Sequence, residues 1–347
     1  MKIVNEPFGV TAQGQPVERY TLTDGNCSAS VLTLGGILQS WTVPDRNGTP
    51  TDIVLGFDSV GAYEAQDCYI GALLGRCANR IADGRITVGQ QTYTLACNDN
   101  GINHLHGGMV GFDRRIWKAT VLPDGLQLQY ESPDGEEGYP GRLSVTAIYR
   151  LTQDTLSIEF FAQSDKDTVC NLSSHSYFNL GGHASGSVGS QMIQVDADRY
   201  TPLASNNAPT GEVASVEGTP FDLRQPVRFD AGWDSDFTQI ALAGGYDHNY
   251  IPAGDGLRPF AQASCPQTGI TLTVTSDMPG VQLYTGNFLR DDLPEGKQHA
   301  KYDRRHGFCL ETQFWPNAFA CPDFPQPIVH VGETYHHITN YRYSVCP

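Results

Sequence analysis

RITVGQQTYTLA, at residues 85–96, contains two short runs in which apolar and polar residues alternate, separated by Gly89 and Gln90. A period of two places alternate side chains on opposite faces of a β-strand, and a glycine-containing break between two such runs predicts a hairpin. Similar alternation predicts strands at residues 116–121, 126–130, 143–151, 155–162, 192–195, 270–276, 281–285 and 341–345. The sequence therefore predicts an all-β protein whose antiparallel strands stack as a sandwich or a barrel.

Turns separate the predicted strands, and long helices are not expected. Clusters such as Pro123-Asp124-Gly125 lie between the alternating runs, and only residues 230–243 form a weak helical candidate. No segment resembles a flexible linker, and no internal repeat of fixed period occurs. We therefore predict that residues 1–347 form a single domain, although a chain of this length often forms two.

The composition indicates a soluble protein with a neutral ligand. Lys and Arg total 22 and Asp and Glu total 38, for a formal charge of −16. Such a balance disfavours nucleic acid and anionic membranes, which attract basic faces. No run approaches the roughly 20 apolar residues that span a bilayer, and the N-terminus lacks the apolar segment of a secretory signal. The nine cysteines show no Cys-x-x-Cys spacing, so we expect reduced thiols in a cytoplasmic protein.

Three segments that mix polar and aromatic residues are candidates for a sugar site. His104 and His106 lie two apart, so on a strand they share a face. His175 and Asp247 each lie among polar and aromatic neighbours, and a sugar needs both hydrogen-bonding groups and apolar surface. A structural role for each histidine stays open, as does a zinc site on the histidine pair, although no HExxH spacing supports a metal.

Glu311 is the acidic candidate. It lies between Leu310 and Thr312 in the segment GFCLETQFWPNA, and burial among apolar residues raises a carboxyl pKa toward the range of a useful base. An exposed position on an edge strand is the alternative, and a pair with Asp247 would instead indicate glycoside hydrolysis. Nucleotide-binding and α/β-hydrolase motifs are absent. These residues by themselves indicate an acidic β-protein with a sugar site.

Seven segments, in order along the chain, resemble the aldose 1-epimerase (galactose mutarotase) family. They are GRCANRIADG (75–84), LHGGMVGFDRRIW (105–117), SSHSYFNLGG (173–182), GTPFDLR (218–224), GYDHNYI (245–251), GVQLYTGNFL (280–289) and GFCLETQFWPNA (307–318). Each is a weak signal alone, but the ordered set is specific. The resemblance implies a large antiparallel β-sandwich, the galactose mutarotase-like supersandwich. It also implies interconversion of the α and β anomers of free aldohexoses, typically galactose and glucose, with no metal or organic cofactor.

The resemblance also implies roles for individual residues. Glu311 resembles the general base of the family and His175 the general acid. Six further positions resemble residues that bind the sugar: Asn79, Arg80, His106, Tyr177, Asp247 and Gln282. One base and one acid suffice, because ring opening removes a proton from the anomeric hydroxyl and delivers another to the ring oxygen.

Two features depart from the family pattern, and two alternative functions stay open. Ser174 stands where the family commonly has asparagine, and residues 204–212 match only loosely. A hexose-6-phosphate 1-epimerase would need a basic pocket for the phosphate. A non-catalytic carbohydrate-binding protein on the same fold would not need Glu311 and His175 together. We expect a small sugar as partner, no nucleic acid or membrane, and a monomer or weak homodimer.

Overall fold

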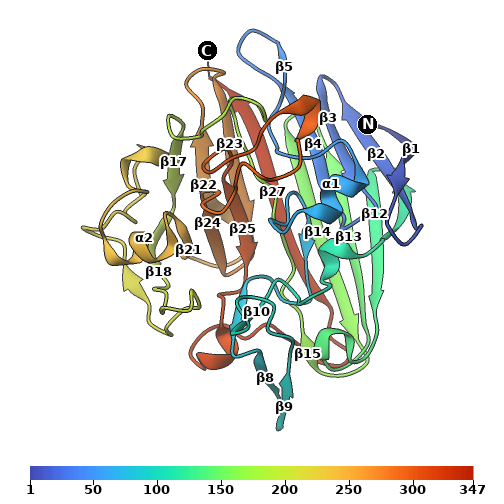
Figure 1. The fold of residues 1–347 in the computed structure, drawn as a ribbon, viewed down its shortest axis with the longest axis vertical. Helices are drawn as coiled ribbons and strands as arrows, with labels where there is room; N and C mark the ends of the chain where they lie inside the picture. Colours follow the sequence, from blue (N-terminus) through green and yellow to red (C-terminus); the bar gives the residue numbers. More distant parts are fainter. Residues whose placement is uncertain (347) are drawn as a thin grey trace.

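Antiparallel sheets dominate the computed structural model, which describes residues 1–346 (Figure 1). The largest sheet contains β11 (Lys118–Leu122), β12 (Gly125–Ser132), β13 (Leu143–Leu151), β14 (Thr155–Ser164), β17 (Met192–Val195), β20 (Val227–Arg228), β22 (Arg258–Ser264), β23 (Ile270–Ser276) and β27 (Tyr335–Val345). Its nine strands follow the order β11-β12-β13-β14-β27-β23-β22-β17-β20. The C-terminal strand β27 therefore joins the meander β11–β14 to the later strands.

Two five-stranded sheets complete the framework. The first is a meander in chain order, formed by β1 (Lys2–Val10), β2 (Pro16–Asp24), β3 (Cys27–Leu32), β4 (Leu38–Pro44) and β5 (Pro50–Asp52). The second contains β18 (Ala197–Tyr200), β19 (Ala214–Ser215), β21 (Asp247–Pro252), β24 (Gly280–Tyr284) and β25 (Cys309–Gln313). Its order is β19-β18-β21-β24-β25, so β25 is an edge strand of that sheet.

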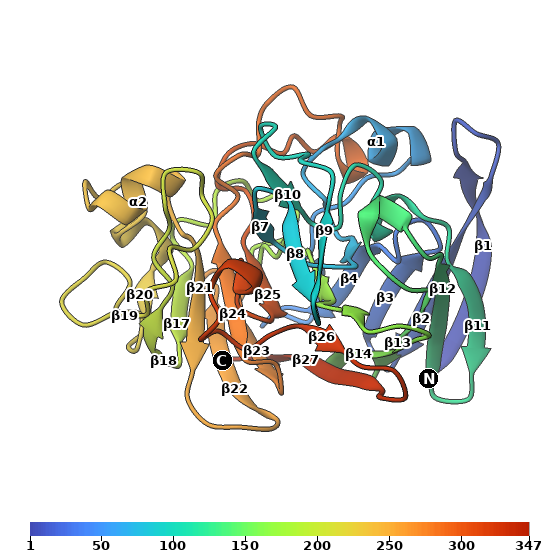
Figure 2. The same ribbon diagram turned by 90° about the horizontal axis from the view of Figure 1, so that it is seen from below.

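Shorter elements connect the three sheets. Four two-stranded pairs are β6 (Leu73–Leu74) with β16 (Ser173–Ser174), β7 (Arg80–Ala82) with β10 (Asn103–Leu105), β8 (Arg85–Val88) with β9 (Gln91–Thr94), and β15 (Thr168–Val169) with β26 (Ile328–Val329). The α-helices are α1 (Val60–Ala65) and α2 (Thr238–Ala243). None of the helices among residues 1–346 could span a lipid bilayer. The pair β8–β9 projects from the lower end of the molecule in Figure 1 and, with β7 and β10, lies near the centre of the view from below in Figure 2.

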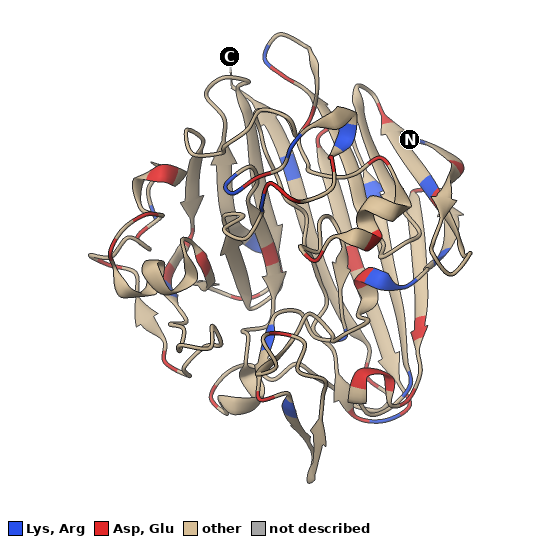
Figure 3. Cartoon of the chain, viewed as in Figure 1, with Lys and Arg blue, Asp and Glu red and all other residues tan. Residues whose placement is uncertain are grey.

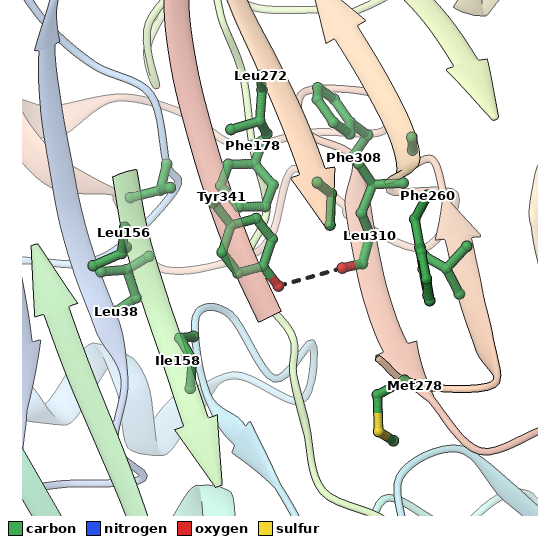
Figure 4. Close-up of a cluster of buried hydrophobic side chains, with 14 of the residues drawn as sticks. Leu38, Leu156, Ile158, Phe178, Phe260, Leu272, Met278, Phe308, Leu310 and Tyr341 are labelled. Atoms are coloured by element: carbon green, nitrogen blue, oxygen red, sulfur yellow. Dashed lines mark hydrogen bonds between the residues drawn. The ribbon is translucent and has the colours of Figure 1, made fainter. Parts of the chain in front are cut away.

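The core forms where alternate side chains of the nine-stranded sheet meet the other sheets. In β14, Leu156 and Ile158 are buried while Ser157 between them is only partly covered. These side chains pack in one cluster with Tyr341 of β27 and Leu310 of β25 (Figure 4). The Tyr341 hydroxyl donates a 3.4 Å hydrogen bond to the carbonyl oxygen of Leu310. Burial of this apolar surface fixes β25 against the larger sheet.

The structure confirms the all-β prediction and the hairpin at residues 85–96. Strands β8 and β9 pair in antiparallel register, with Val88 opposite Gln91 at the turn. The alternation did not reveal β1–β5. In β1, the reason is that the strand is exposed along most of its length, so its two faces differ little in burial. Figure 3 shows acidic residues spread along many loops and elements rather than gathered on one of them.

The predicted helix over residues 230–243 is wrong in its first half, because only Thr238–Ala243 forms α2. Tertiary contacts hold the preceding residues in another path. The guanidinium of Arg305 lies 4.5 Å from the centre of the Trp233 ring. A side chain at Gly232 would collide with the hydroxyl of Tyr246.

Candidate active site

A pocket forms where β25, the segment after β16, and the ends of β7 and β10 meet. Its lining residues are Asp67, Cys68, Tyr69, Asn79, Arg80, Leu105, His106, His175, Tyr177, Asp247, Tyr284, Phe288, Arg290 and Glu311. Seven of the eight residues predicted at the site are among them. The eighth, Gln282, does not line the pocket; its amide instead donates a 2.7 Å hydrogen bond to Asp247.

His175 and Glu311 face each other across the pocket. Nε2 of His175 lies 3.7 Å from Oε1 of Glu311, and both side chains are at least 94% buried. Backbone hydrogen bonds with Gly71 and Ala72 hold the His175 backbone in place. The other oxygen of Glu311 has no hydrogen-bond partner among residues 1–346. A separation of 3.7 Å is longer than a good hydrogen bond, so each group keeps capacity to bond a ligand.

His106 has a defined tautomer. The backbone N–H of Asn79 donates a 3.0 Å hydrogen bond to Nδ1 of His106, and the backbone N–H of His106 donates to the backbone carbonyl oxygen of Asn79. A nitrogen that accepts a hydrogen bond carries no proton, so the proton of neutral His106 is on Nε2. Next to it, Gly107 has no room for a side chain, because a Cβ would collide with the Gly75 carbonyl. His106 therefore presents an N–H donor rather than a basic nitrogen.

Carboxylates hold Arg80 at the pocket. Its Nε donates a 2.8 Å hydrogen bond to Asp99, and Nη1 lies 3.9 Å from Asp247. Asp247 in turn accepts the hydrogen bond from Gln282. Asp99 is not one of the predicted site residues. It lies in a loop, where no sequence pattern indicated a role at the site. Arg80 and Asp247 together offer a donor and an acceptor to the hydroxyls of a sugar.

Burial shifts the proton affinities of the two facing groups. Burial lowers the pKa of His175 to about 4. Burial, and secondly the charge of Asp247, raise the pKa of Glu311 well above its usual value. Burial also raises the pKa of Asp247, which Arg80 and Gln282 partly counteract. Both His175 and Glu311 are therefore pushed toward their neutral forms.

Aromatic rings form the remaining walls. The Tyr69 ring packs against both histidines, with its centroid 4.6 Å from that of His106 and 5.9 Å from that of His175, while the two imidazoles are 5.3 Å apart. Tyr177 packs at 5.0 Å from His175, but its hydroxyl donates to the carbonyl oxygen of Cys68. Tyr177 therefore contributes its ring. Tyr69 and Tyr284 were not predicted from the sequence. Tyr69 belongs to no recognisable motif, whereas Tyr284 lies two residues after Gln282, a spacing that could have indicated it.

The two departures from the family pattern lie beside the site and outside its reacting centre. The Ser174 hydroxyl pairs with the hydroxyl of Ser176 at 3.0 Å, and not with the ring of His175. In the loosely matching segment, the Asn206 carbonyl accepts a 2.7 Å hydrogen bond from Asn103 of β10.

The donor set does not suit a metal ion. His106, His175 and Glu311 offer one atom each within 4.8 Å of one another. A metal-binding histidine uses an unprotonated nitrogen and donates its other N–H to an acceptor. His106 has the reverse arrangement, because the Asn79 amide already occupies its unprotonated nitrogen. The pocket is equally unsuited to phosphate, because carboxylates pair with both of its described arginines, Arg80 and Arg290.

Comparison with known proteins identifies the class of the protein. The family model "Aldose 1-epimerase" matches residues 18–342. The galactose mutarotase of Bos taurus is 42% identical over 330 residues, covering 95% of this chain and 94% of its own. The aldose 1-epimerase of Escherichia coli K12 is 35% identical, covering 98% of this chain and 99% of its own.

Solved structures agree with the sequence relatives. An aldose epimerase homologue from C. elegans superposes with a TM-score of 0.87 at 26% identity, covering 94% of this chain and 98% of its own. Galactose 1-epimerase from Lactobacillus acidophilus gives 0.86 at 26% identity over the full length of both chains. The fold and the site define a carbohydrate isomerase. The chain belongs to the aldose 1-epimerase family and interconverts the anomers of aldoses.

Proposed function

We propose that this protein interconverts the α and β anomers of galactose and glucose, with Glu311 as general base and His175 as general acid. The observation that carries the assignment is the buried pair itself, with Nε2 of His175 3.7 Å from Oε1 of Glu311 at the pocket. The similarity to galactose mutarotases over nearly the whole chain supports galactose as a substrate.

The reaction needs two proton transfers. Glu311 takes the proton of the anomeric hydroxyl, and the C1–O1 bond becomes the carbonyl of the open-chain aldose. The bond between C1 and the ring oxygen breaks, and its electron pair stays on that oxygen, which takes the Nε2 proton of His175. Rotation about the C1–C2 bond presents the opposite face of the carbonyl. The reverse transfers then close the ring as the other anomer.

His175 and Glu311 together hold one exchangeable proton throughout the reaction. With the cyclic sugar, Glu311 is a carboxylate and His175 an imidazolium; with the open-chain sugar both are neutral. Burial lowers the pKa of His175 and raises that of Glu311, so the pocket favours the neutral pair that accompanies the open-chain sugar. A buried, weakly basic imidazole is also a strong acid once protonated, which suits donation to the ring oxygen.

The surrounding residues bind the sugar. The Nε2–H of His106 and the guanidinium of Arg80 are donors, while the Asp247 carboxylate accepts from hydroxyls. The rings of Tyr69, Tyr177 and Phe288 supply apolar surface at the pocket. The apolar face of a sugar, formed by its C–H groups, packs against such rings.

Polarimetry on freshly dissolved α-D-galactose tests the proposal. With nanomolar to micromolar protein, we expect the optical rotation to relax faster than in buffer and to reach the same endpoint. α-D-glucose should behave likewise, and galactose 6-phosphate should relax at the rate of its blank. Rates equal to the blank for both free sugars would overturn the substrate assignment.

A further inference from the structure

Cys309 lies against the ring nitrogen of His175 that faces away from Glu311. The thiol sulfur is 3.5 Å from Nδ1 of His175, while Nε2 of the same ring lies 3.7 Å from Glu311. Both Cys309 and Glu311 belong to β25 and are two residues apart. Side chains two apart on a strand share a face, so one strand supplies groups to both sides of the imidazole.

We propose that Cys309 is a positioning residue: its sulfur accepts the Nδ1–H of His175 and keeps Nε2 as the nitrogen that exchanges its proton with the sugar. The inference rests on the proposed role of His175. An acid that delivers its Nε2 proton must keep the Nδ1 proton, so that Nε2 is free to take the proton back at ring closure. A thiol sulfur is a weak acceptor that suits this site.

The position is closed to water, so the histidine has few other partners there. Cys309 is fully buried, and burial raises the pKa of its thiol well above the usual value, which keeps the group uncharged. The ring of Tyr177 lies 5.0 Å from the imidazole and that of Tyr284 6.0 Å from it. These rings limit tilting of the imidazole, and the sulfur is the polar side-chain atom that meets Nδ1.

A neutral partner has a chemical consequence. In hydrolases with a Ser-His-Asp triad, a carboxylate binds Nδ1–H and stabilises the imidazolium. A carboxylate would therefore weaken His175 as an acid. The Cys309 thiol orients the ring without adding negative charge, so that His175 remains a ready proton donor.

Nuclear magnetic resonance of protein labelled with ¹⁵N-histidine tests the assignment directly. Two-bond ¹H–¹⁵N correlations distinguish Nδ1–H from Nε2–H, and His175 is assigned by its absence in His175→Asn. In the unaltered protein at neutral pH, we expect His175 to be protonated at Nδ1 and His106 at Nε2. A neutral His175 that is protonated at Nε2 and not at Nδ1 would overturn the proposal.

Three variants then separate positioning from packing. Cys309→Ala should lower kcat about 3- to 10-fold with little change in KM, and an Nε2–H population of His175 should appear. Cys309→Ser keeps a small neutral acceptor and should restore both properties to within about twofold. Cys170→Ala is the packing control, because Cys170 is also fully buried and lies outside the pocket.

The outcomes distinguish this proposal from that of the acid itself. Normal turnover in His175→Asn would remove the proposed role of His175. If that variant is inactive but Cys309→Ala matches Cys170→Ala in kcat and retains a single His175 tautomer, only the role of Cys309 is overturned.

Discussion

The backbone amide of Asn79 donates a hydrogen bond of 3.0 Å to Nδ1 of His106. Both residues have positive φ angles, 64° and 51°, a conformation that is strained for side chains other than glycine. Strain of this kind persists where surrounding structure enforces it. Here the reciprocal backbone and side-chain bonds between Asn79 and His106 hold the imidazole with its N–H directed to the pocket.

The fixed tautomer of His106 predicts how its replacements behave. In His106→Gln, the amide nitrogen lies near the position of Nε2 and can still donate, so we expect an increase in KM of only a few-fold. His106→Leu removes the donor and should raise KM by 10-fold or more. A change of this size corresponds to the binding free energy of about one hydrogen bond to a polar ligand. Steady-state polarimetry measures both constants. Equal effects of the two replacements would contradict a donor role.

Removal of metal ions should leave the reaction unchanged. Because His106 offers a protonated nitrogen to the pocket, the three potential ligands do not form a favourable metal site. We expect the same kcat and KM before and after dialysis against EDTA. Activity that disappears on dialysis and returns with zinc would show that the hydrogen bond between Asn79 and His106 opens to admit a metal.

Glu311→Gln and His175→Asn should each abolish most turnover. A positioned acid or base contributes about 10²- to 10⁴-fold, so we expect kcat to fall by at least 100-fold in each variant. Both replacements keep a similar shape, so the thermal unfolding midpoint should stay within a few degrees. Glu131→Gln, at an exposed carboxylate, is the matched control and should retain full activity. Near-normal turnover in either site variant would falsify the assignment.

Asp99→Asn should weaken sugar binding without direct contact to the sugar. Asp99 holds Arg80 through a 2.8 Å hydrogen bond to Nε, and an amide cannot replace its charge. We expect KM to rise about 3- to 10-fold, with a smaller change in kcat, because Arg80 then adopts other orientations. Asp124→Asn is a suitable control, since Asp124 pairs with Arg150 on the exposed side of the nine-stranded sheet. Unchanged KM in Asp99→Asn would mean that Arg80 needs no such anchor.

Acid should destabilise the protein through its buried histidines. Burial lowers the pKa of His248 to about 3, whereas an unfolded histidine titrates near ~6.5. Between these values the unfolded chain binds the extra proton, so the free energy of unfolding decreases as pH falls. The slope is up to about 1.4 kcal/mol per pH unit for each such histidine.

Urea unfolding at several pH values between 4 and 7 measures this slope. His248→Gln removes one titrating group and should flatten the dependence. His299→Gln is the control of opposite sign, because hydrogen bonding to Glu295 raises the pKa of the exposed His299, and it should not flatten the slope. An unchanged slope in His248→Gln would show that His248 is not buried in its neutral form.

Much of the fold follows from local sequence. The predicted strands at residues 143–151, 192–195 and 270–276 coincide with β13, β17 and β23. Their side chains alternate between a buried face and a more exposed face, and this difference is visible in the sequence itself. Strand β25 carries no such signal, because all five of its residues are buried. In such a strand, alternation cannot tell which face Glu311 occupies.

The strand-rich class follows from alternation along the chain, and the family and the residue types at the site follow from the ordered motifs. The partners of those residues depend on how the sheets assemble. Gln282 holds Asp247 instead of lining the pocket, Asp99 anchors Arg80, and Cys309 meets His175. Sequence cannot show these contacts, because hydrogen-bond partners and tautomers depend on groups that lie far apart in the chain. Local pattern specifies how each strand packs, whereas the assembled sheets specify which atoms meet.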